Sequence, residues 1–118
     1  MEFEEETKKK VEELQLLENY LQNFLMQRQS FNLELGELNN ALAELKISDD
    51  EVYKISSGVM FKSTKQKIFT ELEEKKKVLE LKIQSVEKQE KLLEKNSSEL
   101  REEIGKIISS DTNKTHRK

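Results

Sequence analysis

The centre of this chain reads Val52-Tyr53-Lys54-Ile55-Ser56-Ser57-Gly58-Val59-Met60-Phe61-Lys62. β-Branched and aromatic residues are frequent on both sides of Ser56-Ser57-Gly58, and this composition is typical of β-strands. Glycine readily adopts the positive φ angles that tight turns require, so these three residues are expected to form the connection between two strands. The stretch therefore predicts a β-hairpin over residues 52–62. Its key residues are Val52, Tyr53, Ile55, Gly58, Val59 and Phe61.

Heptad repeats flank the hairpin on both sides. Apolar residues recur at alternating steps of three and four from Leu14 to Leu45, and again from Phe69 to Ile107. Such a repeat forms a narrow apolar seam that another helix must cover. We therefore expect a single, mostly α domain over residues 1–118, with helices over about 4–46 and 64–109 and a disordered tail over 110–118. Because the helices are similar in length and joined by a short hairpin, they should pack as an antiparallel coiled coil.

Composition and charge exclude several classes of protein. The chain has 118 residues, of which 38% are charged and 34% apolar, and it contains no cysteine, proline or tryptophan. This balance favours solvated helices over a globular core, and it excludes disulfides and thiol chemistry. The net charge of −3 and the absence of a basic face argue against binding to nucleic acid. The acidic N-terminus and the lack of a long apolar run predict a cytoplasmic protein that does not enter a membrane.

Catalysis has little support in the sequence. The only histidine, His116, lies in the expected tail, and the three glycines are scattered rather than grouped in a phosphate-binding loop. No spacing typical of metal ligands is present, so we expect no catalytic residue, no metal and no cofactor. Interaction with other proteins is therefore the expected function.

The predicted hairpin is larger than a helical hairpin needs. A two-stranded hairpin is only marginally stable in water, and its edges carry unpaired N–H and C=O groups. Hairpins from several chains could pair into an intersubunit β-barrel or sheet, which we favour. Alternatively, the hairpin could fold down onto its own helices.

A pattern in the hairpin resembles that of beta-type prefoldin subunits. Tyr53-Lys54 precedes Gly58 by a few residues, and Lys62 follows it, between two long heptad helices. The commoner family spacing has two residues before the glycine and four after it, whereas this chain has three on each side, which affects the turn rather than the architecture. The resemblance covers about residues 5–109. The single hairpin distinguishes beta-type from alpha-type subunits, which have two.

The resemblance implies a subunit of an archaeal or eukaryotic chaperone, an ATP-independent holdase. Its hexamer would contain two alpha-type and four beta-type subunits, with hairpins forming a platform and coiled coils holding non-native polypeptides at their tips. Those polypeptides would pass to a group II chaperonin. The alternative is a homo-oligomeric coiled-coil scaffold or adaptor with one defined partner.

In this chain the tips would combine about residues 1–20 with about residues 100–110. Lys10 and Thr7 occupy the seam there, so the helix end should fray and expose apolar side chains. Ile104 and Ile107 could equally be ordinary seam residues. The expected client-binding residues are Phe3, Val11, Leu14, Leu16, Ile104, Ile107 and Ile108.

Overall fold

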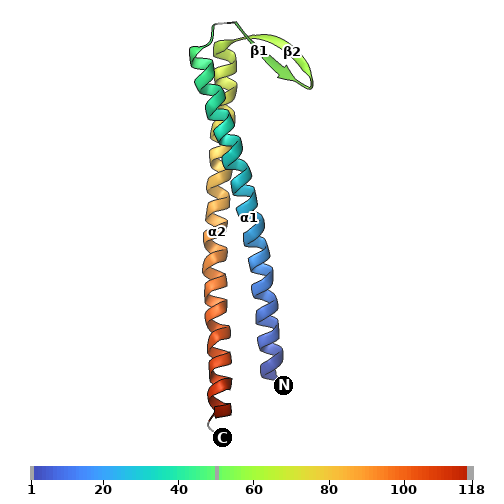
Figure 1. The fold of residues 1–118 in the computed structure, drawn as a ribbon, viewed down its shortest axis with the longest axis vertical. Helices are drawn as coiled ribbons and strands as arrows, with labels where there is room; N and C mark the ends of the chain where they lie inside the picture. The colour runs from blue at the N-terminus through green and yellow to red at the C-terminus, as the bar shows by residue number, and fades with distance from the viewer. Residues whose placement is uncertain (1, 50, 117–118) are drawn as a thin grey trace. The chain divides into compact units, whose positions relative to one another are not determined.

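The computed structural model describes the backbone of residues 2–49 and 51–116, and the side chains of residues 4–49, 51–55 and 57–110. In the chain order shown in Figure 1, its elements are helix α1 (Glu2–Ile47), strand β1 (Glu51–Ser56), strand β2 (Val59–Thr64) and helix α2 (Lys65–His116). The fold is therefore mostly α, with one antiparallel hairpin between two long helices in the described ranges, as predicted.

The chain divides into two compact units, which are described separately. The hairpin unit is Arg28–Ser85, and the terminal unit combines Met1–Gln27 with Val86–Lys118. In both units the inward side chains follow the predicted heptad positions of α1 and α2. The two seams were therefore predicted in the correct register.

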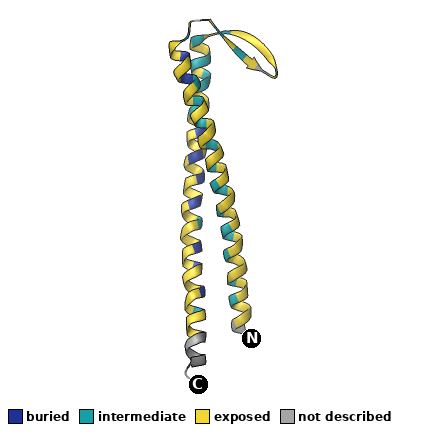
Figure 2. Cartoon of the chain, viewed as in Figure 1, coloured by how far each residue is buried: buried dark blue, intermediate teal, exposed yellow. Residues whose placement is uncertain are grey.

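In the hairpin unit, the two helix segments run antiparallel. The Lys82 ammonium lies 5.9 Å from the centre of the Phe31 ring, while Lys65, at the start of α2, reaches the end of α1. Leucine and isoleucine fill the seam between them, because a stripe of large aliphatic side chains is what a facing helix buries best. The buried core residues, dark blue in Figure 2, are Leu42, Leu45, Leu79 and Ile83.

The turn of the hairpin is tighter than the sequence indicated. β1 and β2 pair from Glu51 with Thr64 to Ser56 with Val59, so Ser56 belongs to a strand and only Ser57 and Gly58 form the connection. Their φ angles are 51° and 78°, and positive φ at both central positions is characteristic of a type I′ turn. The prediction of a three-residue connection was wrong because serine, unlike glycine, gives no sequence signal for a positive φ.

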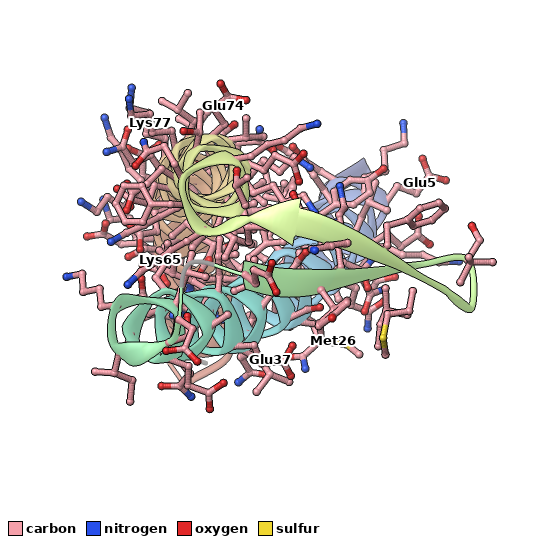
Figure 3. All side chains as sticks on the ribbon, turned by 90° about the horizontal axis from the view of Figure 1, so that it is seen from above. Glu5, Met26, Glu37, Lys65, Glu74 and Lys77 are labelled. Carbon is pink, nitrogen blue, oxygen red and sulfur yellow. The ribbon has the colours of Figure 1, made fainter. Side chains whose placement is uncertain are left out.

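Two side chains donate hydrogen bonds to backbone carbonyls at the C-terminal end of α1. Ser48 Oγ donates a hydrogen bond of 2.8 Å to the Leu45 carbonyl. Lys65 Nζ donates to the carbonyls of Lys46 and Ser48, at 2.9 and 3.1 Å. The last carbonyls of a helix lack partners within the helix and carry partial negative charge, so an ammonium group is well suited to this position. In Figure 3 Lys65 lies between the adjoining ends of α1 and α2.

Helix α2 begins with a threonine cap. Thr64 Oγ1 accepts a hydrogen bond of 3.3 Å from the Lys67 backbone N–H, as an N-cap side chain does. The helix starts only after Thr64, because Ser63 and Thr64 are still in the strand ladder, where Ser63 pairs with Val52.

In the terminal unit the seam contains polar residues as well as apolar ones. Lys10 of α1 pairs with Glu103 of α2 at 3.2 Å, and Glu18 pairs with Arg101 at 2.6 Å, so these segments also run antiparallel. The buried residues of this unit are Val86, Glu90, Ser97, Leu100 and Ile104.

Two expectations about the helix ends differ from the structure. α1 begins at Glu2, slightly before the predicted start, and Lys10 at its seam forms ion pairs with Glu6 and Glu103. α2 continues to His116 instead of ending near Ser109 before a disordered tail. No proline or glycine interrupts residues 110–116, so nothing in the backbone chemistry stops the helix there.

Candidate functional site

The hairpin presents apolar side chains on both of its faces. Residues directly opposite each other in an antiparallel pair share a face, and successive residues alternate between faces. The outer face therefore carries Tyr53, Ile55 and Met60, followed by Lys62. The helix-side face carries Val52, Lys54, Val59 and Phe61.

The helix-side face takes its name from an ion pair to α2. Lys54 Nζ lies 2.8 Å from Glu71 Oε2, and both side chains are partly exposed. The hydrogen bond from Lys54 lowers the pKa of the Glu71 carboxyl, and the positive charge of Lys54 adds to this effect. This contact links β1 to α2 and shows which face of the hairpin is directed toward α2.

The predicted hairpin residues lie on a largely uncovered surface. Tyr53, Ile55, Val59 and Phe61 are each more than half exposed, while Val52 is half-buried. Gly58 is in the turn, as predicted. The sequence analysis grouped these residues together, but strand alternation places Tyr53 and Ile55 on the face opposite to Val59 and Phe61.

Met60 was missed by the sequence analysis. It pairs with Ile55 on the outer face and is 62% exposed. The signal that could have identified it is the strand register, because a two-residue turn places residues 55 and 60 opposite each other. With a three-residue connection, that pairing was not evident.

The predicted client-binding residues divide into three groups in the terminal unit. Val11, Leu16 and Ile108 are exposed, whereas Leu14 and Ile107 are half-buried at seam positions. Ile104 is buried in the seam, at 8% exposure. Phe3 lies outside the residues whose side chains are described.

Other apolar side chains of the terminal unit are exposed without having been predicted. They lie off the seam, and the heptad pattern itself is the signal that could have identified them as unburied. These residues are Tyr20, Met26 and Leu92.

Lys10 occupies a seam position of α1 near the N-terminal end of that helix. Its ammonium contacts Glu103 at 3.2 Å and Glu6 at 3.5 Å, so a cation in the seam is neutralised from both helices. The hydrogen bond to Glu103 raises the pKa of Lys10. Its alkyl stem covers the seam while its charge stays near water, which is how lysine usually occupies such a position.

The described residues offer little for other classes of function. Among them, no group of three or more histidine, cysteine or acidic side chains is arranged to hold a metal ion. None of the helices, within the described ranges, has an apolar segment of the length and hydropathy that crossing a bilayer requires.

Comparison with known proteins gives a consistent result. A model of the family described as "Prefoldin subunit" matches residues 8–111. Prefoldin subunit beta of Saccharolobus islandicus is 31% identical over 106 residues, which cover 88% of this chain and 84% of that protein. Prefoldin subunit beta of Pyrobaculum islandicum is 35% identical over 91 residues, covering 75% and 73% of the two chains.

A solved structure shares the fold. The crystal structure of the prefoldin beta subunit from Thermococcus strain KS-1 matches with a TM-score of 0.79 and 34% sequence identity, over 84% of this chain and 89% of that chain. The residues matched by the family model, 8–111, include most of both helices and the whole hairpin. This chain therefore belongs to the prefoldin family of chaperone subunits, as a member of the beta type.

Proposed function

We propose that this chain is a subunit of an ATP-independent holdase that acts in the cytoplasm. It binds non-native polypeptides at the tip of its coiled coil and passes them to a group II chaperonin, with no catalytic step and no cofactor. Family membership supports the general assignment. The exposed Val11, Leu16 and Ile108 near the two helix ends carry the proposal, because exposed apolar groups are what a non-native chain can bind.

The second part of the proposal concerns assembly. The chain joins alpha-type subunits and further beta-type copies, in a hexamer of two alpha-type and four beta-type subunits, through its hairpin. The supporting observation is that the outer face exposes Tyr53, Ile55 and Met60, and that each six-residue strand has one unpaired edge within the described structure. Edges and apolar faces of this kind are stabilised by pairing with other strands.

The client-binding part is tested by removing the exposed apolar groups. In the reconstituted complex, a variant carrying Val11→Ser, Leu16→Ser and Ile108→Ser should lose most of its ability to suppress aggregation of a chemically denatured protein. A control carries Met26→Ser and Leu92→Ser, which are in the same unit and at least as exposed but lie farther from the helix ends. Equal suppression by both variants would refute the assignment of the client surface to the tip.

Assembly is tested by the mass of the purified chain, alone and mixed with an alpha-type subunit. A heterohexamer is the expected result. A homodimer that does not bind the alpha-type subunit would instead favour a homo-oligomeric scaffold.

A further inference from the structure

Met60 lies on the outer face of the hairpin, close to the turn. It pairs with Ile55 in the strand ladder, and Tyr53 lies on the same face at the next position of β1 that points outward. Met60 is 62% exposed, with Ile55 at 69% and Tyr53 at 61%. Small molecules dissolved in water therefore reach the Met60 side chain in the isolated chain.

The thioether of methionine is the group of this chain that peroxides attack most readily. The sequence contains no cysteine, and its methionines are Met1, Met26 and Met60, so Met60 carries the only sulfur of the hairpin. The sulfur attacks one oxygen of hydrogen peroxide, and an S–O bond forms as the O–O bond breaks. The sulfur loses two electrons to the peroxide, and the departing hydroxide takes up the proton of the transferred oxygen and leaves as water. The product, methionine sulfoxide, is polar, and methionine sulfoxide reductases convert it back to methionine.

A sulfoxide at Met60 has different effects in the free chain and in an interface. In the free chain its oxygen stays hydrated, because the side chain is exposed. In an interface formed by the outer face, the oxygen loses water while Ile55, directly opposite, offers no hydrogen-bond donor in its side chain. The donors of this face belong to Tyr53 and Lys62, the next pair of the ladder along this face, and Lys62 already binds Glu51 at 3.0 Å. Burying a polar group without a partner is unfavourable, so oxidation opposes association and leaves the fold of the free chain intact.

Met26 supplies an internal comparison. It is 59% exposed, almost as much as Met60, so a peroxide in solution should oxidise the two residues of the free chain at similar rates. Met26 lies on α1 in the terminal unit, off the heptad seam and outside the hairpin. Its oxidation should therefore leave association through the hairpin unchanged.

We propose that Met60 is a site of reversible oxidation that controls the entry of this chain into its complex. The sulfoxide form stays unassembled, and assembly in turn protects the methionine. The inference rests on the proposed assembly through the hairpin. The two effects are reciprocal, because a modification that weakens association is by the same amount less favourable in the associated chain than in the free one.

The test uses the full chain and its Met60→Leu and Met26→Leu variants. Each is treated with hydrogen peroxide, freed of it and mixed with an untreated alpha-type subunit, and analytical ultracentrifugation gives the ratio of the dissociation constants after and before treatment. The ratio should be about tenfold or more for the unsubstituted chain and for Met26→Leu, and near unity for Met60→Leu. Each variant is compared with its own untreated form, so any effect of the substitution cancels, and Met1 is common to all of them. Methionine sulfoxide reductase should restore the untreated affinity, while the circular dichroism of the free chain stays the same throughout.

Peptide mass spectrometry measures the protection. In the assembled complex Met26 should oxidise as it does in the free chain, whereas Met60 should oxidise more slowly; equal rates for Met60 in both states would overturn the inference.

The outcomes separate this inference from the proposed assembly. If peroxide weakens association of Met60→Leu as much as that of the unsubstituted chain, Met60 is not the controlling site and the assembly through the hairpin stands. If the untreated chain forms no heterohexamer, the proposed assembly fails and the inference fails with it.

Discussion

We predict that the buried hydroxyl of Ser97 destabilises the terminal unit and that its removal stabilises the chain. Ser97 occupies a seam position of α2 one turn from the buried Leu100, and it is 1% exposed. Its Oγ has no hydrogen-bond partner among the described residues. On folding, a buried hydroxyl loses its hydrogen bonds to water. If it gains no hydrogen-bond partner in the protein, it destabilises the folded state.

The magnitude follows from three effects of Ser97→Ala. Leaving a polar group buried and unpaired costs about 1–3 kcal/mol, and alanine is favoured over serine in a helix by about 0.5 kcal/mol. The small void left by the oxygen offsets part of this gain, so we expect a net stabilisation of about 1–2 kcal/mol. The control is Ser98→Ala, because Ser98 is exposed on the same helix and should gain only the helix-propensity share, about 0.5 kcal/mol.

Thermal unfolding followed by circular dichroism measures the difference. At this chain length 1 kcal/mol corresponds to about 3–6 °C in Tm, so Ser97→Ala should melt several degrees above Ser98→Ala. Both must be measured at one protein concentration, since association makes Tm depend on concentration. If Ser97→Ala melts at or below Ser98→Ala, the hydroxyl is satisfied in solution and the reasoning is refuted.

Three further predictions concern the connection between the helices. Thr64→Ala should destabilise the chain by about 1 kcal/mol in urea unfolding, because the cap on the Lys67 N–H is lost, while Thr64→Ser should retain most of the stability; equal stabilities would contradict the cap. Gly58→Ala should cost about 1–2 kcal/mol in the same assay, since φ is 78° there, and an unchanged midpoint would argue against the type I′ turn. Because Lys54 lowers the pKa of Glu71, their contact contributes stability above the ordinary Glu pKa of 4.5 and loses it as the pH falls through the lowered value. An NMR titration should show this pKa rising toward 4.5 in Lys54→Met, and no change would count against the ion pair.

The helices and their inward faces could be predicted from sequence because heptad spacing is a local property. Leu14 to Leu45 and Phe69 to Ile107 lie at the spacing that one helix face requires, whatever covers them. The hairpin was predicted for a similar reason, since β-branched and aromatic residues flank a glycine. The register of the hairpin could not be predicted, because the choice between a two-residue and a three-residue turn depended on the φ angle of Ser57.

The candidate site was predicted only in part. Val11, Leu16 and Ile108 are off-seam residues, and their exposure follows from the heptad pattern. The burial of Ile104 was left open, since a seam residue near a helix end is covered only if the other helix stays folded opposite it. In the structure Lys10 forms ion pairs with Glu6 and Glu103 at that end of the seam, and these contacts between side chains could not be read from the heptad pattern.

By itself, the sequence determined two amphipathic helices, a hairpin between them and the absence of thiol chemistry, because spacing and composition act over a few residues. Only the tertiary structure decided which face of the hairpin is directed toward α2 and how Lys65 caps the end of α1. Each of these depends on contacts between residues about 17 or more positions apart. Their geometry is set by how the chain folds back on itself, and no local pattern specifies it.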